Sequence, residues 1–241
     1  MDAGDRVRFL TWDSDFFNLR IARIQSDRLD AAGLAEIFAW RQAEAVDCLY
    51  FLADPNHSES LRLAESHGFR LVDLRLTLEW RAEGQAPEMP PEVRLFQPQD
   101  RAALRAIARV SHTDSRFYFD GHFAPEDCDR LYDTWIDKSC DGYADVVLVA
   151  DVGGQAVGYM TCSRENGEGI IGLVGVHPDY QGRALGKALV HSSLAWFAGQ
   201  GLNRVSVVTQ GRNIRAQRLY QRCGFLSRSV QLWFHWWNES R

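Results

Sequence analysis

Residues 174–188 have the sequence VGVHPDYQGRALGKA and predict a strand, a turn and a helix in that order. A short apolar run ends near Val176, and from Leu185 apolar residues recur at helical spacing. Where a strand turns into a helix, the first helical N–H groups lack intrahelical acceptors and point outward with the positive end of the helix dipole. The stretch therefore predicts a binding site for an anion such as phosphate or pyrophosphate.

The residues of this turn suit a phosphate. Gly182, Ala184 and Gly186 keep bulky side chains away from the backbone, while Arg183 and Lys187 add positive charge. The stretch contains neither the G-K-[ST] ending of a P-loop nor the G-x-G-x-x-G of a dinucleotide fingerprint. The alternative interpretation is a compact strand-to-helix turn that binds nothing.

The chain around this turn predicts one α/β sheet with the order β-α-α-β-β-β-α-β-α-β from residue 93 onward. A hairpin spans residues 146–160, and further elements follow at 170–176, 185–199, 205–208, 213–223 and 229–237. In the last strand, alternation sends Trp233 and Trp237 to one face and Phe234 and Trp236 to the other. Both faces of that strand should then be covered.

A Pro- and Gly-rich linker at residues 81–91 predicts two domains, 1–80 and 92–241. Residues 62–69 align with 218–225, and at the same offset Trp80 aligns with Trp236. The first half therefore reads as a reduced copy of the second, although glycines at helix ends are common enough for the similarity to arise by chance.

Composition narrows the class of protein. The chain has 241 residues, 46% hydrophobic and 24% charged, with a net charge of −5. This favours a soluble globular protein and argues against nucleic-acid binding. Five scattered cysteines without metal-ligand spacing predict no metal and a reducing compartment. The start resembles no secretory signal, and no apolar run approaches a membrane span, so we expect a cytoplasmic protein without membrane partners.

Two segments resemble the GNAT superfamily of N-acetyltransferases. Gln181-x-x-Ala184-x-Gly186 is similar to its acyl-CoA signature, with alanine in place of the first glycine. Residues 213–225 are similar to its N-x-x-A-x-x-L-Y-x-x-x-G-F helix. The resemblance covers residues 93–237. It implies a GNAT fold, whose mixed, splayed sheet admits the pantetheine arm of acetyl-CoA between two parting strands, preceded here by a smaller, degenerate GNAT-like domain.

The resemblance implies roles for individual residues. Tyr220 would be the general acid that protonates the departing thiolate, because a phenol (pKa ~10) stays protonated where a thiol (~8.5) ionises; the alternative is a packing tyrosine. Asn213 is also expected at the site, where it can cap its helix. Glu165 is the candidate general base, and a solvated carboxylate at a strand end is its alternative. The expected acetyl-CoA contacts are Val174, Gly175, Val176, Gln181, Gly182, Arg183, Ala184, Leu185, Gly186, Lys187, Asn213 and Tyr220, with an oxyanion donor near Val174 or Gly175.

Residues 9–18, 115–118 and 132–136 resemble the TDP-fucosamine acetyltransferases of bacterial surface-polysaccharide synthesis. This implies a homodimer that acetylates the 4-amino group of dTDP-4-amino-4,6-dideoxy-D-galactose. Arg116 would pair with the diphosphate and Phe117, Tyr118 or Phe119 would stack on the substrate, unless they are packing residues. Two alternatives remain: a GNAT enzyme for another amine (an amino acid, a protein N-terminus or a drug), and a non-catalytic acyl-CoA-binding regulatory domain.

Overall fold

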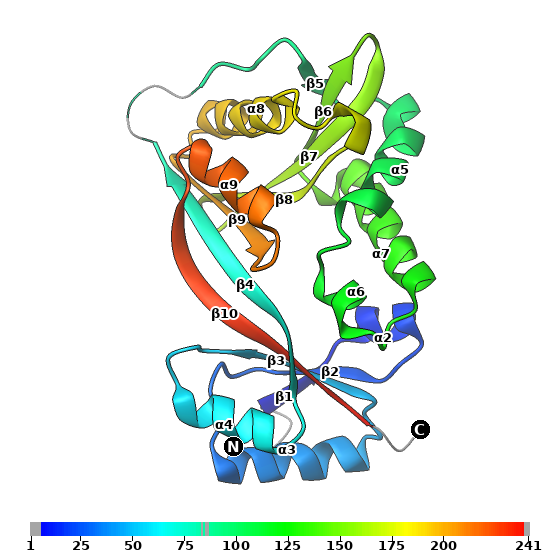
Figure 1. Ribbon diagram of the computed structural model, residues 1–241, viewed down its shortest axis with the longest axis vertical. Helices are drawn as coiled ribbons and strands as arrows, with labels where there is room; N and C mark the ends of the chain where they lie inside the picture. Colours follow the sequence, from blue (N-terminus) through cyan, green and yellow to red (C-terminus); the bar gives the residue numbers. More distant parts are fainter. Residues whose placement is uncertain (1–5, 83, 85–86, 239–241) are drawn as a thin grey trace.

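The computed structural model describes residues 6–82, 84 and 87–238, whose strands form one open, mixed sheet (Figure 1). The ten strands run in the order β1-β2-β3-β10-β4-β9-β8-β7-β6-β5. Their bounds are Val7–Phe9 (β1), Ile21–Ile24 (β2), Cys48–Ala53 (β3), Arg70–Arg81 (β4), Val93–Leu95 (β5), Val146–Val152 (β6), Gln155–Glu165 (β7), Glu168–Val176 (β8), Arg204–Gln210 (β9) and Leu226–Trp237 (β10). The α-helices are Thr11–Phe17 (α2), Ala31–Ala43 (α3), Ser58–Ser66 (α4), Arg101–Ser111 (α5), Arg116–Asp120 (α6), Pro125–Lys138 (α7), Leu185–Gly199 (α8) and Ile214–Arg222 (α9).

The last strand of the chain lies in the middle of the sheet. β10 pairs antiparallel with β3 on one side and with β4 on the other, and β4 pairs antiparallel with β9. The two halves on either side of the predicted linker therefore share one sheet. Each half contributes a long strand that pairs with the other half. Linker residues 83, 85 and 86 lie outside the described residues, as does the start at residues 1–5.

The two copies of the predicted repeat are both helix-to-strand junctions. α4 leads through Gly68 into β4, and α9 leads through Gly224 into β10; both glycines have positive φ, 81° and 88°. A Cβ at Gly224 would lie 3.5 Å from Trp80, and one at Gly68 would lie 3.8 Å from Trp236. Each half therefore packs its tryptophan against the glycine of the other half.

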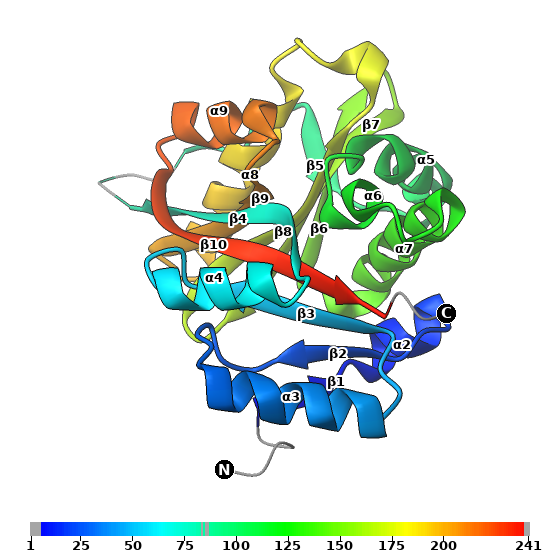
Figure 2. The same ribbon diagram turned by 60° about the horizontal axis from the view of Figure 1, so that its bottom comes forward.

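Helices cover both faces of the sheet. α3, α4, α8 and α9 lie on one face, and α2, α5, α6 and α7 lie on the other (Figure 2). Neighbouring residues of β6 show the division, because Leu148 packs in the cluster under α8 and Val149 in the cluster under α5. In β10, Trp233 packs on the α6 side and Phe234 on the α3–α4 side. The predicted alternation of the aromatic strand and the need for cover on both faces are thus confirmed.

The predicted elements of the second half are confirmed, with shifted ends. β10 begins at Leu226, three residues before the predicted start, and β8 begins at Glu168. The five-residue helix α6 was not predicted. None of the helices in the described ranges is long and apolar enough to cross a membrane.

Candidate active site

β8 and β9 separate partway along their length. They pair in parallel only from Gly169 to Ile171, opposite Val205 to Val207. Beyond this point β8 continues to Val176 and β9 to Gln210 without pairing with each other. The facing edges of residues 172–176 and 208–210 therefore present backbone groups to a gap. Such an edge can hydrogen-bond an extended ligand that carries amides, as a further strand would.

The backbone amide of Val174 faces this gap. Leu173 N–H points the other way, because it donates to Thr161 Oγ1 of β7 at 2.8 Å. Successive backbone groups of a strand point to opposite edges, so Val174 N–H points toward β9. Gly175 serves close packing instead, because a Cβ there would lie 2.9 Å from both Ser111 and Tyr159. Of the two expected oxyanion donors, the geometry favours Val174.

The turn after β8 leaves the start of α8 free to bind an anion. Gly182 has φ +79°, and Ala184, which precedes the helix, has φ +61° in the left-handed region. No side chain of the described residues caps α8, so its first N–H groups remain unpaired by a cap. Residues 182–184 and Lys187 are exposed. The sequence-predicted turn is therefore open to solvent, with the helix dipole directed at it.

Side chains around the turn connect it to β8 and α9. Gln181 Nε2 donates to Val176 C=O at 3.0 Å, and Gln181 Oε1 accepts a hydrogen bond from Arg215 of α9. Arg183 lies over the Tyr180 ring, with its guanidinium carbon 5.0 Å from the ring centroid. Neither Arg183 nor Lys187 forms an ion pair with a described residue, so both charges remain available to an anion. Gln181 therefore braces the turn, and the two cations supply its charge.

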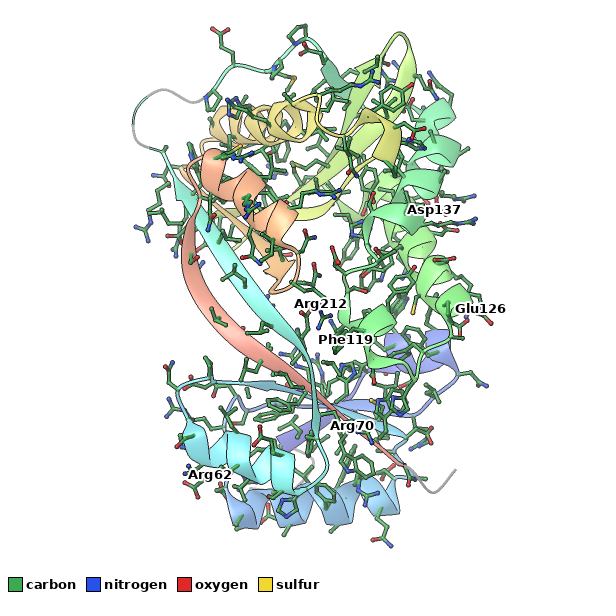
Figure 3. All side chains as sticks on the ribbon, in the orientation of Figure 1. Arg62, Arg70, Phe119, Glu126, Asp137 and Arg212 are labelled. Carbon is green, nitrogen blue, oxygen red and sulfur yellow. The ribbon has the colours of Figure 1, made fainter. Side chains whose placement is uncertain are left out.

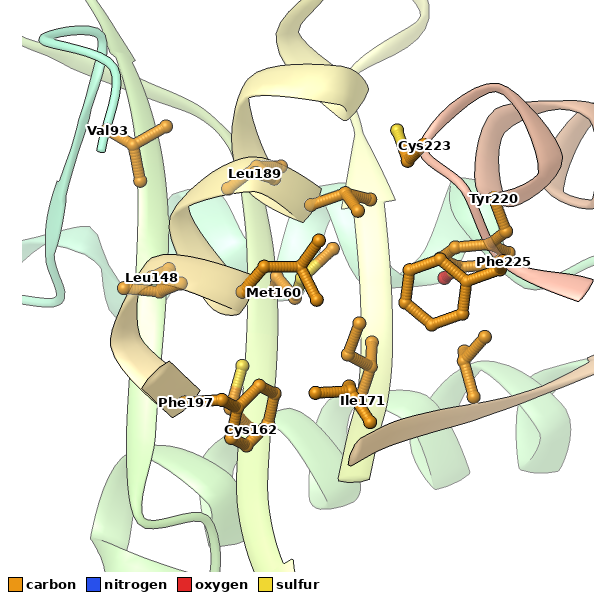
Figure 4. Close-up of a cluster of buried hydrophobic side chains, with 14 of the residues drawn as sticks. Val93, Leu148, Met160, Cys162, Ile171, Leu189, Phe197, Tyr220, Cys223 and Phe225 are labelled. Atoms are coloured by element: carbon orange, nitrogen blue, oxygen red, sulfur yellow. The ribbon is translucent and has the colours of Figure 1, made fainter. Parts of the chain in front are cut away.

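Tyr220 projects from α9 into the core beside the point where β8 and β9 part. Figure 4 shows it directed toward β8, next to Ile171 and Phe225. It is 3% exposed, and burial raises its pKa well above the usual value of a phenol. The side chain therefore stays protonated at neutral pH, as a general acid must. No hydrogen bond to its hydroxyl is formed by the described residues.

Asn213 caps α9, as predicted. Its Oδ1 accepts a hydrogen bond from Ala216 N–H at 2.9 Å. The next residues of α9 also hold the end of β9, since Gln217 Nε2 donates to the carbonyls of Gln210 and Gly211 at 3.0 and 2.9 Å. Asn213 thus fixes the start of the helix that carries Tyr220.

Glu165 does not lie with these groups. It is exposed at the β7–β8 hairpin and pairs in register with Glu168, the first residue of β8. The turn follows Val176 at the other end of β8, roughly 26 Å away at about 3.3 Å per residue. The structure therefore places the candidate base at the far end of the strand, and its solvated-carboxylate alternative fits this position.

The candidate acceptor residues lie on α6, and three of them, Arg116, Phe117 and Tyr118, face different ways. Phe117 is 2% exposed and packs with Phe17, so it is a core residue and does not stack on a ligand. Tyr118 Oη donates to Asp129 Oδ1 at 2.5 Å, which ties α6 to α7. Arg116 alone of the three points over the sheet, with its guanidinium carbon 4.4 Å from the Trp233 ring centroid.

Sequence reasoning missed the polar residues of β4 on this face. Asp73 is buried, and burial raises the pKa of its carboxyl to about 6, although Arg212 lies 3.8 Å away. Arg212 donates to the Val72 carbonyl at 2.6 Å and lies over Phe119, which is 59% exposed (Figure 3). The alternation of polar residues along β4 was the available signal, but alone it indicates a solvent face.

Replacing Gly182 by valine tests the turn. The Cβ would meet no protein atom within 4 Å, but valine is strained at φ +79° and would intrude where the phosphate approaches. We expect the Kd for coenzyme A, measured by calorimetry, to rise about 10-fold or more. Gly167→Val is the matched control, because Gly167 has φ +78°, equally open surroundings and a place at the far end of β8. Equal affinities of the two variants for coenzyme A would contradict the proposed turn.

Comparison with known proteins identifies the class. Residues 107–225 match the Acetyltransferase (GNAT) family. The match takes in the parting strands, the turn and both helices described above. The chain therefore carries a GNAT acetyltransferase domain, as the resemblance of the turn and of α9 implied.

Individual relatives and a solved structure agree with this. The chain is 28% identical to the dTDP-fucosamine acetyltransferase of Escherichia coli O6:H1 (strain CFT073) over 237 residues, 94% of this chain and 96% of that protein. It is 30% identical to the spore coat polysaccharide biosynthesis protein SpsD of Bacillus subtilis (strain 168) over 148 residues, 61% of this chain and 50% of SpsD. The chain thus spans half the length of SpsD. A GCN5-related N-acetyltransferase from Sphaerobacter thermophilus superposes with a TM-score of 0.66 at 20% identity, covering 95% of this chain and 75% of the other, which confirms the fold.

Proposed function

We propose that the protein transfers an acetyl group from acetyl-CoA to the 4-amino group of a dTDP-linked 4-amino-4,6-dideoxyhexose. The observation that carries this proposal is the match to the E. coli dTDP-fucosamine acetyltransferase, which extends over 94% of this chain and 96% of that protein. The catalytic domain alone would align with many GNAT enzymes. A match that also takes in the first half supports a shared acceptor.

The site residues divide the reaction between them. The open turn at residues 181–187 would hold the pyrophosphate of acetyl-CoA, and the gap between β8 and β9 would hold its pantetheine arm. The neutral amine attacks the thioester carbonyl carbon, and Val174 N–H donates to the oxygen that becomes negative. The C–N bond forms, the C–S bond breaks, and Tyr220 gives its proton to the thiolate. The amine loses one proton, which restores the Tyr220 hydroxyl directly or through solvent.

Mass spectrometry of the product tests the acceptor. The purified protein is incubated with acetyl-CoA and dTDP-4-amino-4,6-dideoxy-D-galactose, and we expect a dTDP-sugar in which one acetyl group replaces one amine hydrogen. Parallel reactions contain an amino acid, a peptide with a free N-terminus or an aminoglycoside drug. Faster release of coenzyme A with one of these amines would contradict the proposed acceptor. Binding of coenzyme A without turnover of any amine would support a regulatory domain instead.

A further inference from the structure

Three arginines from separate elements lie near Trp233 of β10, on the face of the sheet that α6 covers, and two of them contact its ring. The guanidinium carbons of Arg116, on α6, and Arg23, on β2, lie 4.4 and 5.1 Å from the Trp233 ring centroid. Arg75, on β4, donates to Gln231 Oε1 at 2.8 Å, two residues before Trp233 in β10. We call Arg23, Arg75 and Arg116 the arginine triad.

The arginine triad lacks an ion-paired carboxylate in the described part of the chain. None of the three arginines forms an ion pair with a carboxylate among residues 6–82, 84 and 87–238. Burial, followed by the charge of Arg116, lowers the pKa of Arg23; burial, followed by the charges of Arg23 and Arg116, lowers the pKa of Arg75. Asp13 and Asp73 lie within electrostatic range of Arg116, but burial raises the pKa of both carboxyls. The cluster therefore repels itself and gains from a bound anion.

Two buried polar atoms, one in the arginine triad and one next to it, also lack hydrogen-bond partners among the described residues. Arg116 Nε and Tyr50 Oη are enclosed and form no hydrogen bond within the described part of the chain. Tyr50 is 0% exposed, and its ring centroid lies 5.2 Å from the Arg116 guanidinium carbon. A buried donor without an acceptor costs about 1–3 kcal/mol. The interior next to the arginine triad is therefore short of acceptor oxygens.

We propose that the arginine triad binds the diphosphate of an acceptor linked to a nucleoside diphosphate. The identity of this acceptor rests on the proposed function. Planar guanidinium groups bind phosphate oxygens in pairs, and the three positive charges more than offset the two negative charges of a diphosphate that links a nucleoside to a sugar. The triad is also placed to present an acceptor to the gap. Arg75 is in register with Gln210, the last residue of β9, where the gap between β8 and β9 opens. A sugar carried on the diphosphate can therefore reach toward Val174.

Binding of dTDP tests the arginine triad without requiring turnover. The full chain is saturated with coenzyme A, which fills the turn, and is then titrated with dTDP, with pyrophosphate and with thymidine. We expect wild type to bind dTDP and pyrophosphate, and to bind thymidine at least about 10-fold more weakly than dTDP. Arg23→Gln and Arg75→Gln should each weaken dTDP binding about 10-fold or more and leave the KM for acetyl-CoA unchanged. Arg62→Gln is the control, because exposed Arg62 lies on α4 across the sheet.

The outcomes separate this inference from the proposed function. Unchanged dTDP affinity in folded Arg23→Gln and Arg75→Gln would overturn the diphosphate site, even in an enzyme that acetylates the dTDP-sugar. If dTDP binding depends on the arginines but the protein acetylates a different amine, the diphosphate site is supported and the proposed acceptor is overturned. Thermal melting of each variant identifies misfolding. Should both variants misfold, we expect higher salt to weaken dTDP binding to wild type and leave thymidine binding unchanged; equal salt dependence would overturn the site.

Discussion

Replacing Tyr220 by phenylalanine should lower kcat for acetyl transfer about 100-fold or more while leaving the KM for acetyl-CoA close to wild type. The expected loss is large because the departing thiolate would have no buried donor for its proton. Burial keeps the pKa of Tyr220 far above neutrality, so the hydroxyl is protonated at every pH at which the enzyme is assayed. The measurement is the steady-state release of coenzyme A at saturating acceptor.

Tyr220→Phe removes the hydroxyl and keeps the ring, which also packs in the core. It contacts Phe225, with ring centroids 5.5 Å apart, and belongs to the cluster under α8. Phenylalanine fills the same volume, and the hydroxyl forms no hydrogen bond with the described residues, so the melting temperature should change little. An unchanged kcat in a folded Tyr220→Phe protein would remove Tyr220 as the acid. A fall in both kcat and melting temperature would instead indicate a role in packing.

The turn could be predicted from sequence because its cause is local. Gly182 and Gly186 mark a strand-to-helix junction, and the helix dipole needs no distant partner to attract an anion. The position of β10 could not be predicted in this way. Its alternating aromatic residues indicate two buried faces but do not identify β3 and β4 as neighbours, because the pairing of a strand depends on residues far away in the chain.

The polar face of β4 shows the same limit. Asp73, Arg75, Thr77 and Glu79 alternate with apolar residues, a pattern typical of a strand with one side in water. In the structure α6 lies against this strand, and Asp73 is only 5% exposed. Glu165 was misplaced for a different reason. Glu165 precedes β8 in the chain, so it lies at the start of that strand, whereas the turn follows the end of the strand at Val176.

The crossed contacts between the halves suggest how they are related. Trp80 packs against Gly224, and Trp236 packs against Gly68, so the two positions of the repeat exchange partners. The long strands cross over in the same way. β4 belongs to the first half and pairs with β9 of the second, while β10 belongs to the second half and pairs with β3 of the first. We propose that residues 1–80 are a degenerate copy of the GNAT domain that keeps this exchange. It has Ala64 in place of Tyr220 and no counterpart of the turn at residues 181–187, so we expect it to bind no acetyl-CoA.

Lowering the pH from 6.5 to 4 should destabilise the protein, and His112 should account for at most about 3 kcal/mol of the loss in the free energy of unfolding. His112 follows α5 and stacks on Tyr132, with ring centroids 4.5 Å apart; its Nε2 lies 2.9 Å from Tyr159 Oη. Burial lowers the pKa of His112 from 6.5 to about 4. As the pH falls below 6.5, His112 takes up a proton in the unfolded chain but not in the folded protein, so stability falls until about pH 4.

His112→Gln tests this origin of acid sensitivity through urea unfolding at pH 7.5, 6, 5 and 4. The amide can still accept a hydrogen bond from Tyr159, but it does not titrate, so the variant should be somewhat less stable at pH 7.5 and lose less stability on acidification. His67→Gln is the control, because His67 is exposed at the end of α4 and should keep the wild-type dependence. Parallel curves for wild type and His112→Gln would assign the acid sensitivity to other groups. A flatter curve for His112→Gln would mean that the contact between α5 and β7 weakens as this imidazole gains its proton.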